Sequence, residues 1–252
     1  MNWCDKLAST PAVGFGLDPY VTSSGTLIDA FAPKLSSLVD GEKLRFTIDQ
    51  SQPCSLTFTT EDGFQTAIDP AKISVSFVHR LTAKQVSGGP PRLEMLSFPR
   101  PYSELLPTVL KMLIEATTSL PSPKTRGLHR IGIVAVTGVS EEEAPPGIIR
   151  FLDYMRDPWD KVFGTYSFSI AAEVGSTSAW RDRCVHILAK GDGKDALLNL
   201  SFDWQRTFAK PRPINPKTLE EIASEAEIAA LAYFEELAEG NRFDANLDRQ
   251  AQ

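Results

Sequence analysis

Residues 198–205, Leu-Asn-Leu-Ser-Phe-Asp-Trp-Gln, alternate strictly between an apolar and a polar side chain. Because successive side chains of a β-strand point to opposite faces, this stretch predicts a strand with one face in a core and the other in water. The same alternation recurs in residues 73–77 (Ile-Ser-Val-Ser-Phe) and 166–170 (Tyr-Ser-Phe-Ser-Ile). Several strands of this kind predict antiparallel sheets with an uncovered polar face.

A long amphipathic stretch follows each series of predicted strands. Residues 102–120 and 217–239 carry apolar side chains at helical spacing, and Gly240 can end the second helix. We therefore predict an α+β fold with two pseudo-repeated antiparallel sheets, each packing a long helix. This arrangement is similar to the TATA-binding-protein-like or helix-grip-like architecture.

The Pro-rich stretch 121–123 is the best candidate for a boundary between the two halves. The expected organisation is an N-terminal α+β half at residues 1–123, a C-terminal α+β half at 124–240 and a frayed tail at 241–252. The sequence leaves open whether the halves form one saddle or two separate domains.

The composition predicts a folded cytoplasmic protein. Of 252 residues, 42% are hydrophobic and 23% are charged, which is ordinary for a globular chain. No apolar run is long enough for a membrane span, and the first residues do not have the pattern of a signal peptide. Three widely spaced cysteines argue against a disulfide framework and a cysteine zinc site.

Charge is unevenly distributed along the chain, whose net charge is −6. Residues 72–130 carry nine basic and three acidic side chains, whereas residues 216–252 carry three basic and nine acidic ones. Two solvated faces would explain this split. The alternatives are a basic patch for an anionic partner or head-to-tail association of copies.

Motifs for metal, nucleotide and nucleophile chemistry are missing. The chain has no HExxH motif, and residues 190–194 (Lys-Gly-Asp-Gly-Lys) lack phosphate-loop spacing and predict a hairpin turn. We therefore expect no metal and no cofactor, and whether the chain is an enzyme is uncertain, with the balance against it. The weak catalytic candidates are Cys184 and His186, which share a strand face, with Asp203 or Ser201 contributed by a neighbouring strand; together they would make a hydrolase.

Two regions are candidates for binding. One is the polar sheet face, and the other is a basic region around residues 80–100 that could hold single-stranded nucleic acid or guide RNA. The candidate binding residues are Arg80, Lys84, Arg92, Arg100, Asn199, Ser201 and Asp203. A ligand cavity between sheet and helix is a further possibility, although a filled core is favoured.

Short motifs along most of the chain resemble a sporadically distributed bacterial family of about this length. They are Thr60-Glu61-Asp62-Gly63, the helix that begins at Tyr102, and Arg126-Gly127-Leu128-His129-Arg130-Ile131, where the family usually has Arg-Tyr-Ile-Asn after the Leu. The family has no assigned activity, so the resemblance implies no catalytic residue. Its patchy occurrence implies an accessory role, for example in mobile-element or defence loci.

The leading functional prediction is a non-enzymatic binding or assembly protein. It would dock a protein partner, or a second copy of itself as an oligomer, through the polar sheet face. The alternatives are a nucleic-acid-associated subunit using the basic region and a hydrolase using Cys184 and His186.

Overall fold

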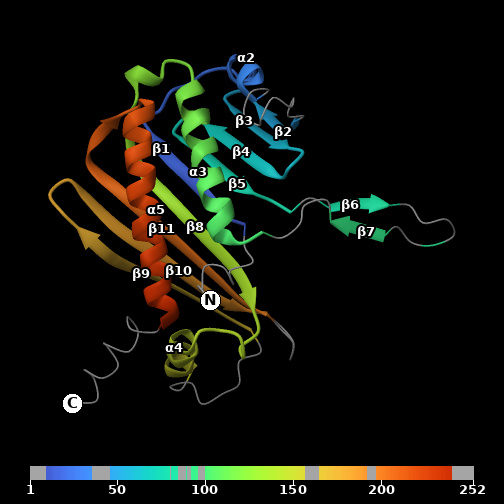
Figure 1. Ribbon diagram of the computed structural model, residues 1–252, viewed down its shortest axis with the longest axis vertical. Coiled ribbons are helices and arrows are strands. Elements are labelled where there is room, and N and C mark those ends of the chain that lie inside the picture. Colours follow the sequence, from blue (N-terminus) through green and yellow to red (C-terminus); the bar gives the residue numbers. More distant parts are fainter. Residues whose placement is uncertain are drawn as a thin grey trace.

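The computed structural model describes residues 10–35, 46–79, 81–84, 89, 92–95, 100–156, 165–191 and 197–239. Figure 1 shows a large sheet with helices across one face. The strands are β1 (Ala12–Leu17), β2 (Phe46–Gln52), β3 (Ser55–Thr60), β4 (Phe64–Asp69), β5 (Lys72–Phe77), β6 (Leu81–Lys84), β7 (Arg92–Met95), β8 (Gly127–Val139), β9 (Tyr166–Ser176), β10 (Trp180–Lys190) and β11 (Leu198–Pro213). The helices are α2 (Ser24–Leu35), α3 (Tyr102–Ser119), α4 (Pro146–Arg156), α5 (Pro216–Glu239) and the short 3₁₀ helix η1 (Pro123–Thr125).

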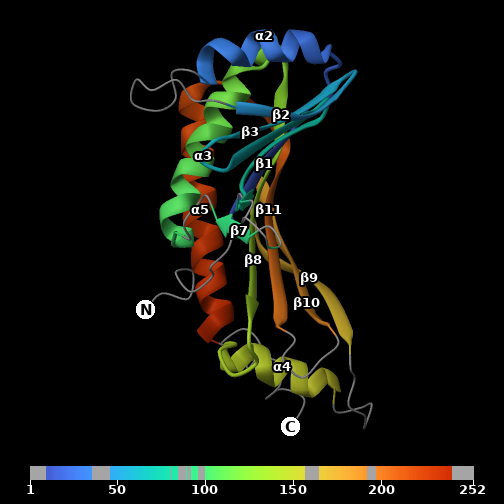
Figure 2. The ribbon, with the colours of Figure 1, turned by 90° about the vertical axis from the view of Figure 1, so that its right-hand side faces the viewer.

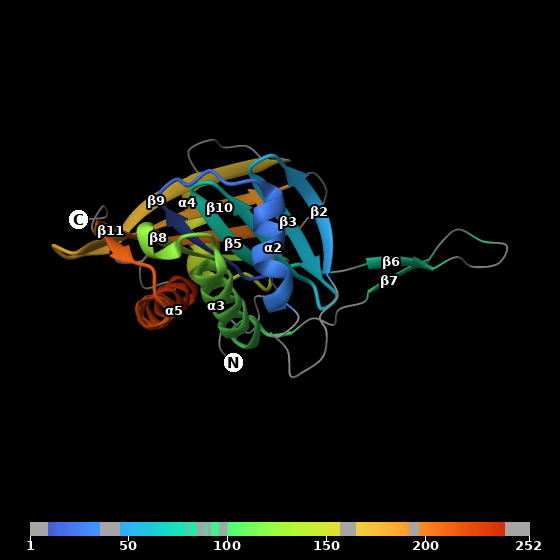
Figure 3. The same cartoon turned by 90° about the horizontal axis from the view of Figure 1, so that it is seen from above.

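Nine strands form one sheet in the order β2-β3-β4-β5-β1-β8-β11-β10-β9. Neighbouring strands pair antiparallel throughout, which confirms the predicted α+β class with a large antiparallel sheet. Two sheets were expected, one in each half. Instead, β1 pairs with β8, with Val13 opposite Ile133, and this pairing joins the strands of both halves into a single sheet. β6 and β7 form a separate hairpin that projects from the body (Figure 3).

The four α-helices of the described residues lie on the same side of this sheet. α3 and α5 run side by side across it, and α2 and α4 lie near its two ends (Figures 1 and 2). The sheet bends away from α3 and α5 at both ends, so its opposite face is concave (Figure 2). This opposite face, which no described helix covers, is called the open face below. In the described part of the chain, no helix is long and apolar enough to cross a membrane.

Strand β11 shows how the alternating sequence produces the two faces. The apolar side chains of Leu198, Leu200, Phe202 and Trp204 are at most 3% exposed and pack beneath the helices. The polar side chains between them lie on the open face, as the alternation predicts. Burial of such apolar area is the main source of stability in a sheet packed by helices.

Local contacts fix the starts of two helices. α2 begins at Ser24, and the Ser23 hydroxyl accepts a hydrogen bond from the Thr26 backbone N–H at 3.2 Å. α3 contains Pro107 and begins at Tyr102, whose fully buried side chain donates a hydrogen bond to the Val134 carbonyl at 3.2 Å.

Polar contacts near the end of β1 connect it to β8. The Asp18 carboxylate accepts hydrogen bonds from the Gly127 backbone N–H at 2.6 Å and pairs with His129 at 2.5 Å. The buried Arg126 side chain donates to the carbonyls of Asp18 and Pro70. A bulge in the β1–β8 pairing gives the buried position to Leu128, so His129 is only half-buried. The hydrogen bonds from His129 and Gly127 lower the pKa of Asp18.

Candidate functional site

A row of side chains crosses the middle of the open face. The pairing register places Lys72 opposite Gly16, Gly16 opposite Arg130, Arg130 opposite Thr207, and Thr207 opposite Arg181. These residues come from five successive strands, and the three charged ones are all cations. We call Lys72, Arg130 and Arg181 the cationic row.

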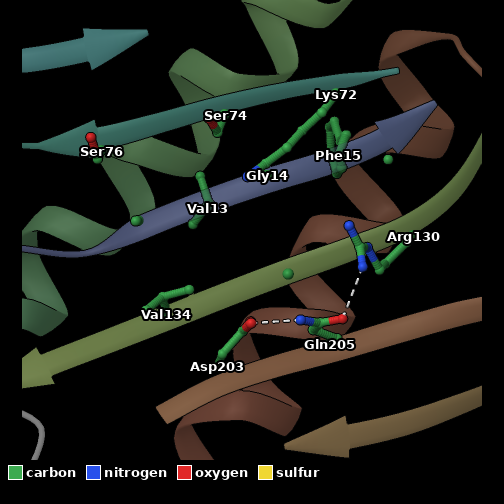
Figure 4. Close-up of a pocket in the computed structure, with 13 residues that line it drawn as sticks. Val13, Gly14, Phe15, Lys72, Ser74, Ser76, Arg130, Val134, Asp203 and Gln205 are labelled. Carbon is green, nitrogen blue, oxygen red and sulfur yellow. Dashed lines mark hydrogen bonds between the residues drawn. The ribbon is translucent and has the colours of Figure 1, made fainter. Parts of the chain in front are cut away.

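The open face is hollowed where the cationic row crosses β1 and β8. This central groove has a volume of about 250 Å³ and extends over β5, β1, β8 and β11 (Figure 4). The side chains that border it are those of Lys72, Ser74, Ser76, Arg130, Asp203 and Gln205. Its floor consists of the backbone at Gly14, Gly16 and Gly132.

The three floor glycines are not required by backbone conformation. Among the described glycines only Gly63 has a positive φ, of 91°, in the β3–β4 turn. A Cβ atom at Gly132 would lie 3.7 Å from its nearest neighbours, which is an ordinary contact distance. At Gly14 a Cβ atom would meet the Ile73 carbonyl at 3.3 Å and the Lys72 side chain at 3.5 Å, and at Gly16 it would meet the Arg130 side chain at 3.4 Å. The glycines of β1 therefore lie directly against the side chains of both cations, whereas the surroundings of Gly132 are less tight.

A hydrogen-bonded chain crosses the groove wall from a cation to a carboxylate. The Arg130 guanidinium donates to the Gln205 side-chain carbonyl at 3.1 Å, and the Gln205 amide donates to Asp203 at 2.6 Å (Figure 4). Burial raises the pKa of Asp203, and the hydrogen bond from Gln205 and the nearby cations oppose this shift. The groove thus offers a cation and a hydrogen-bond acceptor on either side of Gln205.

A second hollow adjoins the central groove and shares Arg130 and Gln205 with it. It has a volume of about 510 Å³ and is bordered by Arg181 and Arg183 on β10. Arg181 forms an exposed ion pair with Glu173 at 3.8 Å. The two hollows together extend the positively charged part of the open face from β5 to β10.

The weak catalytic candidates do not come together. Cys184 is fully buried and His186 is 4% exposed, both on the helix side of the sheet. The His186 ring bonds the Tyr233 hydroxyl of α5 at 2.9 Å and the Ile170 carbonyl at 3.2 Å. Asp203 pairs with Val185 and therefore lies on the open face. The expectation that it would approach His186 is wrong, and Ser201, on the same face as Asp203, does not approach it either.

The candidate binding residues divide between separate places. Lys84 and Arg92 are exposed and lie opposite each other on the β6–β7 hairpin, while Arg80 lies outside the described residues. The Arg100 guanidinium lies 6.0 and 5.8 Å from the Phe64 and Phe77 ring centres. Asn199, Ser201 and Asp203 follow one another along the open face of β11. Lys84, Arg92 and Arg100 are therefore not part of the cationic row.

Sequence reasoning found the polar face but missed the cationic row and the glycine floor. The available signal was the pattern of β1, Ala-Val-Gly-Phe-Gly-Leu, in which glycine alternates with bulky apolar residues. The cations of the row come from β5, β8 and β10, so only the pairing register brings them together.

Comparisons with known proteins assign no family to this chain. No family model matches the chain, and a search of curated proteins finds no match. Among the described residues, no group of three or more histidine, cysteine, aspartate or glutamate side chains could hold a metal ion.

Proposed function

We propose that this chain is a non-enzymatic binding protein that docks a partner protein on its open face. The observation that carries the proposal is the central groove, where Gly132 stands although a Cβ atom would fit there at ordinary contact distances and the backbone conformation does not require glycine. Glycine inside a strand weakens it, and its presence there often marks close approach of a ligand or another chain.

The dimensions of the open face suit a protein partner. Nine strands at a spacing of about 4.8 Å give a width of roughly 40 Å, which is enough for a standard interface of about 800 Å² per partner. Beside the groove, Val136 and Ile187 are 42% and 41% exposed and flank Ser201 in one cross-strand row. An apolar contact next to polar groups is typical of an interface centre with a polar rim.

We also infer that the two halves are equivalent units arranged like the two halves of the TATA-binding-protein saddle. In support, their first strands, β1 and β8, pair in the middle of the sheet, and β5 and β11 flank them. The long helices α3 and α5 then end the two halves. An experimental structure in which residues 1–123 and 124–240 superimpose strand for strand supports this inference, and mismatched strand orders contradict it.

Site-specific photo-crosslinking in cells tests the docking surface. A photoreactive amino acid at Ser201, on the open face, is expected to give protein adducts, whereas the same residue at the exposed Ser224 of α5 is not. Protease treatment must remove the adducts, whereas nuclease treatment must leave them intact. The Gly132→Val variant must give no adducts. Absence of adducts at Ser201, or equal adducts at Ser224, refutes the proposal. An adduct of twice the chain mass shows a second copy and refutes a distinct partner.

A second candidate function rests on the β6–β7 hairpin. Lys84 and Arg92 lie directly opposite each other there and both are exposed. Two adjacent exposed cations can contact neighbouring phosphates of single-stranded RNA. In an electrophoretic mobility-shift assay with single-stranded RNA, the double variant Lys84→Glu/Arg92→Glu should abolish a salt-sensitive shift, while Lys124→Glu should not. If the unmodified chain gives no shift at low salt, this candidate function is refuted.

A further inference from the structure

We propose that the segment bound in the central groove is an acidic polypeptide in extended conformation, lying across the strands along the cationic row. This inference rests on the proposed docking function and adds the chemistry of the occupant. It follows from the charges, the spacing and the hydrogen-bonding groups of the groove.

Charge complementarity favours an anionic occupant. The cationic row and Arg183 place four cations around the two hollows, against three carboxylates, Asp203, Glu173 and Asp69, the last of which lies opposite Lys72 on β4. The chain as a whole has a net charge of −6, so this positive area is not a consequence of overall composition. Complementary charge sets the orientation and association rate of a partner more than its affinity.

The spacing of the cationic row fits an extended polypeptide. Lys72, Arg130 and Arg181 stand on every second strand, so their backbones are about 10 Å apart at the usual strand spacing. In an extended chain of the polyproline II type, which has three residues per turn and rises about 3.1 Å per residue, every third residue returns to the same side after about 9 Å. A segment with a carboxylate at every third residue can therefore meet each cation of the row in turn.

The groove also contains groups that distinguish a polypeptide from a nucleic acid. Asp203, held by Gln205, can accept a hydrogen bond from a backbone N–H of the bound segment, but it would repel a phosphate. The large aromatic side chains of β11, Phe202 and Trp204, are buried beneath the helices and cannot stack on bases. The missing side chain at Gly132 lets a main chain approach the sheet closely.

Fluorescence anisotropy with three labelled probes at low salt tests this inference. The probes are a peptide with glutamate at every third residue, its glutamine analogue, and an oligothymidylate of the same charge as the acidic peptide. The acidic peptide should bind at least tenfold more tightly than either other probe, a difference of about 1.4 kcal/mol.

Matched variants locate the binding. Lys72→Glu/Arg130→Glu should weaken binding of the acidic peptide at least tenfold, whereas Lys124→Glu/Lys217→Glu, with the same change in net charge away from the open face, should not. Gly132→Val should abolish binding, while Gly138→Val, on the same strand and face but outside the groove, should preserve it.

No binding of the acidic peptide, equal binding of the glutamine analogue, or tighter binding of the oligothymidylate overturns the inference. Any of these results with crosslinking at Ser201 intact refutes only the chemistry of the occupant. Loss of that crosslinking refutes the docking function itself.

Discussion

Replacement of Gly132 by valine tests whether the fold or a bound ligand requires glycine at this position. The new Cβ atom would lie 3.7 Å from the Gln205 Cγ atom and the Trp204 carbonyl, and 3.8 Å from an Asp203 carboxylate oxygen. Because these are ordinary contacts and valine favours strands, Gly132→Val should stabilise the protein by about 0.5–1 kcal/mol. The same side chain fills the groove floor, so binding should be lost while stability rises.

Calorimetry and urea unfolding of both proteins measure the first effect. For a chain of this size, 1 kcal/mol corresponds to a melting temperature about 2–4 °C higher. Gly138→Val is the control, since its Cβ would meet side-chain atoms of Asn199 and Leu197 at 3.4 Å. If Gly132→Val instead destabilised the protein by more than about 1 kcal/mol, the glycine would serve the fold, and the reasoning for an occupied groove would fail.

Three further predictions concern polar groups outside the groove. Arg206→Met leaves the buried Asp182 carboxylate without its two 2.8 Å hydrogen bonds, so urea unfolding should show a loss of about 3–5 kcal/mol; a loss below about 1 kcal/mol would contradict this. Tyr233→Phe removes the buried hydroxyl bonded to His186 and should lower the free energy of unfolding by about 1–2 kcal/mol in the same assay. An unchanged free energy of unfolding would contradict this prediction. The lowered pKa of Asp18 means that its carboxylate stabilises the fold above pH 3.8 and that this stabilisation is lost as pH falls through the folded-state pKa. Asp18→Asn should therefore flatten the acid limb of a stability–pH curve; an unchanged limb would disprove this role.

Local sequence was sufficient to predict the class of fold. Strict alternation in β11 and helical spacing in α3 and α5 determine which side chains must be buried, and these signals do not depend on distant partners. The turn at Gly63 was also predictable, because a positive φ favours glycine.

Strand β10 shows why the candidate site could not be predicted in the same way. Both of its faces mix polar and apolar residues, so alternation does not say which one is buried. The buried face contains Asp182 and His186, which are tolerated only because Arg206 and Tyr233 bond them from β11 and α5. Partners that lie far away in sequence therefore decide the orientation of this strand, and with it the separation of His186 from the open face.

The cationic row was unpredictable for a related reason. Lys72, Arg130 and Arg181 become neighbours through three independent pairing registers, none of which is encoded next to the residues themselves. The glycines of β1 were visible in the sequence, but their meaning depended on which side chains lay across them.

The pairing of β1 with β8 has a consequence for how the chain is synthesised. β1 leaves the ribosome early, yet one of its two edges is completed only by β8, after α3 has been made. Until then the nascent first half exposes a strand edge that includes Val13 and Phe15, where another chain can add. Expressed alone, residues 1–123 should aggregate or pair edge to edge, and co-expression with residues 124–240 should rescue them as a split protein.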